Sequence, residues 1–143
     1  MAAALMAALV ATVALLVVTA YFLMGSVPLL VLRHDTPLDA RFIRGFYNTY
    51  YSGATLSAGA TAVAYALAAR PAYAAGAAAL ALLAILLRRT VIPKMDSLRA
   101  HMTTSESTAI AGFRRLHVTA ILINTAQLGL IVWSLIVLSI QMK

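Results

Sequence analysis

Four long uncharged runs dominate the pattern of hydrophobic and polar positions: Met1 to Leu32, Gly45 to Ala69, Pro71 to Leu87 and Leu116 to Met142. A helix needs about 20 predominantly apolar residues to cross the hydrocarbon core of a bilayer. The pattern therefore predicts an all-α integral membrane protein, built as an antiparallel bundle of four transmembrane helices in one domain over 1–143. We expect these helices at about 3–32, 42–69, 71–92 with a continuation to 102, and 104–141.

Composition supports a chain that lipid covers. Of the 143 residues, 63% are hydrophobic and 10% are charged, whereas about a quarter of the residues of a soluble domain are charged. The mean hydropathy is +0.92. The lipid bilayer is thus the first expected partner. The chain has no cysteine, which excludes disulfides, thiolate metal sites and cysteine nucleophiles.

Charge predicts the orientation. Nine of the eleven Lys and Arg residues lie in the first and third connections or their flanks, and Arg70 and Lys143 lie on the other side. Because Lys and Arg stay on the cytoplasmic side, we expect both termini outside, in what is most simply a bacterial inner membrane. The basic residues form no basic helix or aromatic-interleaved patch, so anionic lipid headgroups are the expected counter-charge rather than nucleic acid.

The connections have features of their own. Pro71 follows a very short link and predicts a tight helix pair. After Pro93 a polar segment keeps helical spacing, and Thr103 with Glu106 resembles a capping box that starts the last helix near Thr104. We therefore expect the third and fourth helices to project into the cytoplasm as a hairpin. Kinks are expected at Pro93 and at Gly25 with Pro28.

Polar side chains inside the spans are the candidates for binding. His117, Asn124 and Gln127 share one face of the last helix. A second stripe starts at the cytoplasmic interface of the second helix and comprises Arg44, Asn48, Tyr51, Ser52 and Thr55. Two interpretations stay open: the stripes hydrogen-bond each other and fix the packing, or they line a ligand cavity open to the cytoplasm. The ligand-binding candidates are Arg44, Tyr47, Asn48, Tyr51, Arg88, Arg115, His117, Asn124 and Gln127.

Other clusters have simpler interpretations. Tyr47, Tyr50 and Tyr51 fall where an aromatic belt would anchor the headgroups. Gly53, Ser57 and Thr61 form a small-residue row that favours close packing inside the bundle, with self-association as a homo-oligomer as the alternative.

Motifs of catalysis and cofactor binding are missing from the sequence. Haem is not favoured, because the spans contain no pair of histidines that could ligate it. His34 and His101 lie in connections. All four carboxylates also lie in connections, which argues against a proton pump. No catalytic triad, Walker loop or metal motif is present, so neither a cofactor nor a catalytic residue is assigned.

The string FRRLHVTAILINTAQLGLIVW, from Phe113 to Trp133, follows the form F-x-x-L-H-x-x-[ST/A]-x-x-x-N. It resembles the closing signature of domain-of-unknown-function family 4149, the TMEM205-like small four-helix membrane proteins. The Gly25–Pro28 turn, the aromatic entry from Phe46 to Tyr51 and the segment from Pro93 to Arg99 agree with it. Ala120 and Asn48 depart from the usual pattern. The resemblance implies the four-helix architecture and, for function, only a link of a eukaryotic member to platinum-drug resistance.

Three functions follow as expectations. The first is a non-catalytic membrane protein that binds a small molecule or lipid in a cytoplasm-facing polar pocket, as a transport or stress-resistance factor. The second is a cofactor-assisted membrane enzyme that acts on a lipophilic substrate, which a fainter likeness to anthrone-oxygenase-like membrane proteins favours. The third is a structural subunit that docks a partner through the projecting hairpin.

Overall fold

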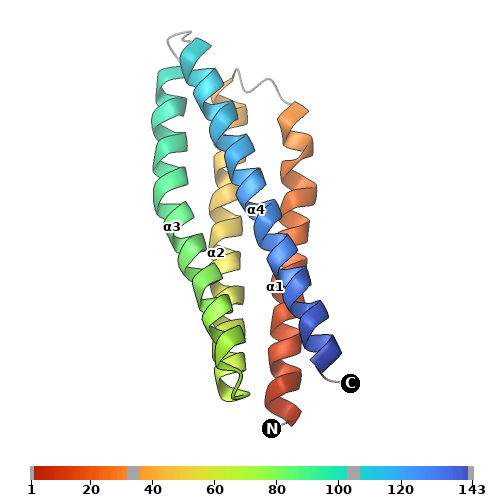
Figure 1. Cartoon of the computed structure of the whole chain (residues 1–143). Helices are drawn as coiled ribbons and strands as arrows, with labels where there is room; N and C mark the ends of the chain where they lie inside the picture. The colour runs from red at the N-terminus through yellow and green to blue at the C-terminus, as the bar shows by residue number, and fades with distance from the viewer. Residues whose placement is uncertain (1, 32–35, 103–106, 142–143) are drawn as a thin grey trace.

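The computed structural model describes residues 2–31, 36–102 and 107–141, and all regular elements in these ranges are helical. The elements are α1 (Ala2–Ser26), the 3-10 helix η1 (Pro28–Val31), α2 (Pro37–Leu67), α3 (Pro71–His101) and α4 (Ser107–Gln141). The four long helices run antiparallel as a bundle, with the start of α1 and the end of α4 at one end (Figure 1). We call this end, which also holds the α2–α3 turn, the terminal end. The other end is the basic end.

Three segments are long and apolar enough to cross a membrane: Ala3–Val31, Pro71–His101 and Thr108–Gln141. The prediction of four helices is thus confirmed for the fold, and three of the four helices have the length and apolar composition that crossing a membrane requires. Helix α2 is less apolar because it carries tyrosines and small polar residues that face its neighbours. It packs most extensively against α3 and next against α1.

The first helix does not continue to residue 32 as one α-helix. It ends at Ser26, and Pro28 starts the short η1. A proline cannot donate the hydrogen bond that would continue the helix, which explains the break. By contrast, Pro93 lies inside α3, which continues without interruption to His101.

Helix α2 begins earlier than the sequence pattern predicts, at Pro37 rather than near residue 42. Thr36 caps it by accepting a hydrogen bond from the Asp39 amide at 3.2 Å. Proline at the first helical position and a Thr-x-x-acid spacing are both start signals, so the sequence contained the information that places this start.

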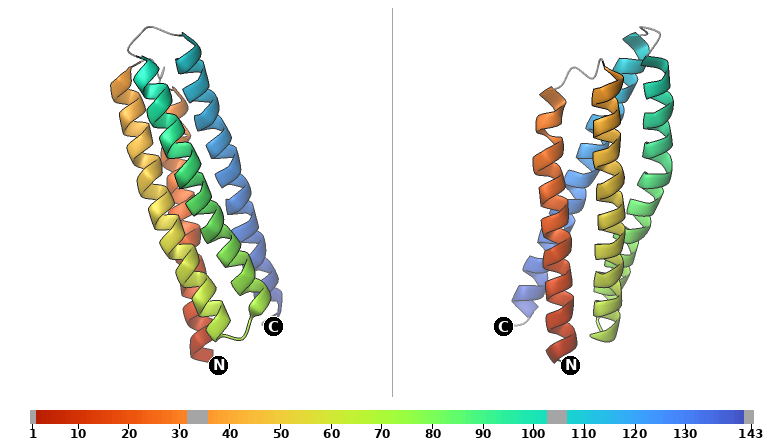
Figure 2. Two further views of the ribbon diagram at one scale, coloured as in Figure 1. Left: turned by 90° about the vertical axis from the view of Figure 1, so that its left-hand side faces the viewer. Right: turned by 180° about the vertical axis from the view of Figure 1, so that it is seen from behind.

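The early start of α2 corrects the expected hairpin. Helices α3 and α4 do not project freely, because the first turns of α2 lie alongside their joined ends (Figure 2). One buried cluster there contains Ile43 of α2, Met95 of α3 and Phe113 of α4, all of them fully buried. The predicted Thr103–Glu106 cap, the start near Thr104, and Arg33, His34 and Asp35 lie outside the described residues.

The α2–α3 link is the tight turn that the sequence predicts. Ala69 adopts a left-handed conformation with φ of 55°, and the Arg70 amide donates to the Tyr65 carbonyl at 2.9 Å. Pro71 then starts α3. This turn lies at the terminal end of the bundle (Figure 1).

Candidate functional site

The predicted polar residues of α2 and α4 do meet, inside the bundle near its basic half. The Tyr47 hydroxyl donates to the His117 carbonyl at 3.2 Å, and the two rings are edge to face with centroids 5.5 Å apart. Tyr47, Tyr51, His117 and Asn124 have no exposed surface, and Gln127 is buried. This buried polar cluster joins α2 to α4.

Two polar atoms of the buried polar cluster lack a partner. Asn124 donates to the Ala120 carbonyl at 2.8 Å, but its Oδ1 and the Tyr51 hydroxyl make no hydrogen bond among the described residues. The Asn124 side chain lies close enough to that hydroxyl to interact with it. The two side chains therefore lie near each other, outside the geometry of a full hydrogen bond.

The buried polar cluster is closed rather than hollow. The space beside Gln127, Thr19 and Tyr50 has a volume of about 10 Å³, which is at most the room of one water. Tyr47, Tyr51, His117 and Asn124 line neither this space nor the three larger cavities found along the described residues. Their contacts join α2 to α4, as the first of the two interpretations left open by the sequence expects.

The tyrosines are not a headgroup belt. Tyr50 is 6% exposed and stacks on Phe22 of α1, with centroids 3.8 Å apart. Tyr47 lies edge to face against the same ring at 4.8 Å. The aromatic entry of α2 thus packs onto α1 and forms core, because the early start of α2 moves these rings well inside the bundle.

The expected α2 stripe divides between two neighbours. Arg44 turns to α3 and forms an ion pair with Asp96, with Nη2 3.0 Å from Oδ2. Asp96 also lies 3.5 Å from Arg99, and Asn48 accepts from the Arg88 guanidinium at 3.0 Å. Tyr51 instead faces α4. Arg115 is exposed on α4, so the nine predicted residues form no single site.

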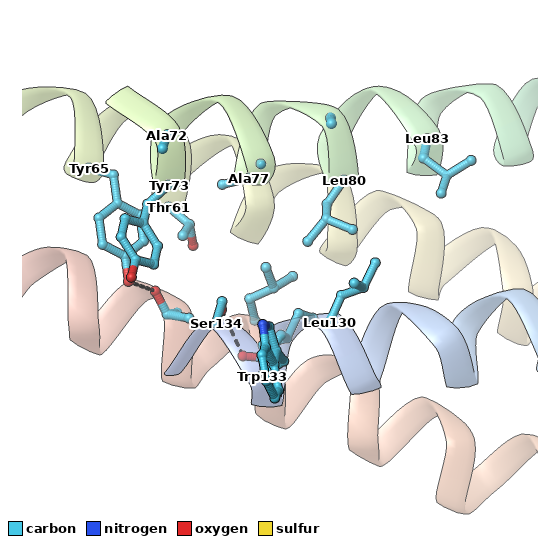
Figure 3. Close-up of a pocket in the computed structure, with 15 residues that line it drawn as sticks. Thr61, Tyr65, Ala72, Tyr73, Ala77, Leu80, Leu83, Leu130, Trp133 and Ser134 are labelled. Carbon is cyan, nitrogen blue, oxygen red and sulfur yellow. Dashed lines mark hydrogen bonds between the residues drawn. The ribbon is translucent and has the colours of Figure 1, made fainter. Parts of the chain in front are cut away.

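A lateral cavity, which the sequence did not suggest, lies in the terminal half of the bundle. It has a volume of about 510 Å³, within the range of roughly 300–1,000 Å³ that is usual for small-molecule sites. Helices α3 and α4 diverge toward the terminal end (Figure 1), and the cavity lies between them with α1 and α2 behind it (Figure 3).

Small residues on α3 create this space. Ala72, Gly76 and Ala79 recur at helical spacing along the cavity, opposite Leu130 and Trp133 of α4. A Cβ added at Gly76 would meet no heavy atom within 4 Å. The alanine-rich composition of this segment is visible in the sequence, but small residues equally allow close helix contact. The divergence of α4 decides which of these occurs.

The polar atoms of the lateral cavity gather at its terminal end. The Thr12 and Tyr65 hydroxyls lie 3.0 Å apart on α1 and α2, and Thr61 and Ser134 also line the wall. Figure 3 shows Tyr65 and Tyr73 at one end of the cavity and Leu83 at the other. None of the described residues that line it is charged.

Metal binding has no support in the described part of the chain, where no three His, Asp or Glu residues group in a way that could hold an ion.

No family model, no curated protein and no solved structure matches this chain.

Proposed function

We propose that this chain is an integral membrane protein that crosses the bilayer four times and binds a lipid or lipophilic small molecule in the lateral cavity. The observation that carries the proposal is the cavity itself: about 510 Å³ of uncharged space between two diverging, strongly apolar helices. An opening between helices gives a hydrophobic molecule access from the bilayer without passage through water.

The surface of α2 supports a fourth span. Leu56, Val63 and Leu67 are between 61% and 75% exposed and share one face of the helix. Large apolar side chains on that face suit contact with lipid. Lipid contact on one face and packed polar residues on the others explain how a helix of modest hydropathy can span the bilayer.

For orientation we propose that the basic end faces the cytoplasm of a bacterial inner membrane, with both termini outside. This rests on the distribution of Lys and Arg. Reporter tags at each terminus test it: an outside location for both is expected, and a cytoplasmic location for either contradicts it. The likeness to family 4149 is part of the same proposal, because it implies the same architecture.

Native mass spectrometry from mild detergent tests the binding function. The wild-type protein is expected to retain a lipophilic molecule, and Gly76→Leu to lose it because leucine fills the cavity. Gly129→Leu is the matched control, since Gly129 also has open space around it but does not line the cavity. Equal retention by all three proteins, or none by any, would overturn the proposal.

A further inference from the structure

We infer that the occupant of the lateral cavity is a neutral amphiphile with a hydroxyl head, a long-chain alcohol in its simplest form. Its hydroxyl lies at the Thr12–Tyr65 pair and its hydrocarbon part lies toward Leu83. This inference rests on the proposed function and names the class of ligand.

The hydroxyls that line the cavity hold their protons in hydrogen bonds within the protein. Thr61 donates to the Ser57 carbonyl at 2.8 Å, and Ser134 donates to the Ile131 carbonyl at 2.8 Å. A hydroxyl has one proton and two lone pairs. Both side chains have therefore committed their proton to the backbone and offer a ligand only lone pairs.

The Thr12–Tyr65 pair leads to the same result. Thr12 Oγ1 lies 2.7 Å from the Ala8 carbonyl and 3.0 Å from the Tyr65 hydroxyl. The protons of the Thr12 and Tyr65 hydroxyls are both used in these two hydrogen bonds. No proton therefore remains to donate to a ligand, but lone pairs of the two oxygens remain to accept from one. The hydroxyls at this end therefore favour a ligand that donates a proton.

One donor faces these acceptors from α4. Trp133 lines the cavity, and its indole N–H is a donor only. Figure 3 draws that nitrogen on the side of the ring toward the cavity. A ligand hydroxyl can accept from Trp133 and donate to the acceptors of α1 and α2, so it satisfies both kinds of group at once.

Anionic heads fit poorly. An ionised carboxylate or phosphate diester has no proton to donate, and burying it beside uncompensated lone pairs without a positive partner is costly. The described lining contains neither Lys nor Arg. The nearest basic residue along α3 is its N-cap, Arg70, so a carboxylate that reached Arg70 is the rival occupant.

The chain contains its own probe for a test, because Trp133 is its sole tryptophan. The protein is reconstituted in phosphatidylcholine vesicles, and its fluorescence is titrated with dibrominated stearyl alcohol or, at alkaline pH, dibrominated stearic acid. Trp133 is 66% exposed, so brominated probe that is dissolved in the surrounding bilayer also quenches it. Each titration is therefore compared between the wild-type protein and Gly76→Leu.

The alcohol is expected to quench wild-type protein at about tenfold lower concentration than Gly76→Leu, and the acid to quench both equally. Tyr65→Phe is expected to weaken binding of the alcohol about fivefold, which is the effect of one lost neutral hydrogen bond. Thr61→Val provides a second change at the same end if Tyr65→Phe unfolds. Arg70→Gln is expected to change nothing.

The other outcomes separate the two claims. Equal, Gly76-sensitive quenching by alcohol and acid would overturn the head-group inference and leave the proposed function standing. A preference for the acid over the alcohol, lost in Arg70→Gln, would also overturn the head-group inference and leave the proposed function standing. If neither probe quenches the wild-type protein more strongly than Gly76→Leu, both the head-group inference and the proposed function are overturned.

Discussion

The hydroxyls of Thr12 and Tyr65 lie 3.0 Å apart and join α1 to α2 at the back of the lateral cavity. Both side chains are 3% exposed. The contact connects two helices at the end of the bundle where α3 and α4 diverge, so it helps to keep the cavity wall in place.

Thr12→Val is expected to lower the free energy of unfolding by about 1 kcal/mol, as interhelical hydrogen bonds of this kind contribute roughly 0.5–1.5 kcal/mol. Thermal unfolding in detergent measures it. Thr125→Val is the control, because the Thr125 hydroxyl donates within its own helix, to the Ile121 carbonyl of α4 at 2.9 Å. A similar loss in both variants would show that the Thr12–Tyr65 contact contributes nothing.

The two tyrosines of the buried polar cluster should respond in opposite directions to the same change. Tyr47→Phe loses a hydrogen bond to the His117 carbonyl and should lower stability by about 1 kcal/mol. Tyr51→Phe removes a buried hydroxyl without a partner among the described residues and should raise it by about as much. Lower stability of Tyr51→Phe would mean that Asn124 or a water satisfies the hydroxyl in solution.

Arg44 and Asp96 connect the first turns of α2 to the end of α3 by hydrogen bonds of 3.0–3.2 Å. Both side chains are about a third exposed, so a double-mutant cycle of Arg44→Gln with Asp96→Asn should give a coupling of about 0.5 kcal/mol that salt reduces. Arg115→Gln removes the same charge from an exposed position and should change stability little. A coupling of zero at low salt would contradict the assignment.

Gly25 packs closely under an aromatic ring. A Cβ there would lie 2.6 Å from Phe46 Cζ, and Phe46 is itself stacked on Phe22 at 5.2 Å. Gly25→Ala should therefore cost roughly 1–3 kcal/mol of stability, and Phe46→Leu should restore part of it in the double variant. Gly45→Ala is the control, because no atom lies within 4 Å of its added Cβ. An unaffected Gly25→Ala would show that the ring moves away freely.

Much of the fold could be predicted from the sequence, because its strongest signal is the length of apolar runs. Four uncharged runs gave four helices, and Pro71 gave the tight turn. The early start of α2 was missed although Thr36, Pro37 and Asp39 encode it. Hydropathy alone marks where lipid contact begins and not where a helix begins.

The candidate site was predicted only in part. Spacing on one helix correctly grouped His117 with Asn124, and these do meet tyrosines of α2. Spacing could not show that Arg44 turns to α3 while Tyr51 turns to α4. The lateral cavity depends on the angle between α3 and α4, which no local pattern encodes, so the alanines and Gly76 of its wall looked like ordinary packing residues.

Photo-crosslinking tests the central claim most directly, namely that the lateral cavity receives a lipophilic molecule from the bilayer. A diazirine-bearing long-chain alcohol is added to the reconstituted protein, irradiated, and its adducts are located by peptide mass spectrometry. We expect saturable adducts on the α3 and α4 segments that carry Leu83, Leu130 and Trp133. These adducts should be lost in Gly76→Leu and kept in Gly129→Leu. Adducts spread over all lipid-facing helix surfaces, non-saturable and unchanged by Gly76→Leu, would contradict it.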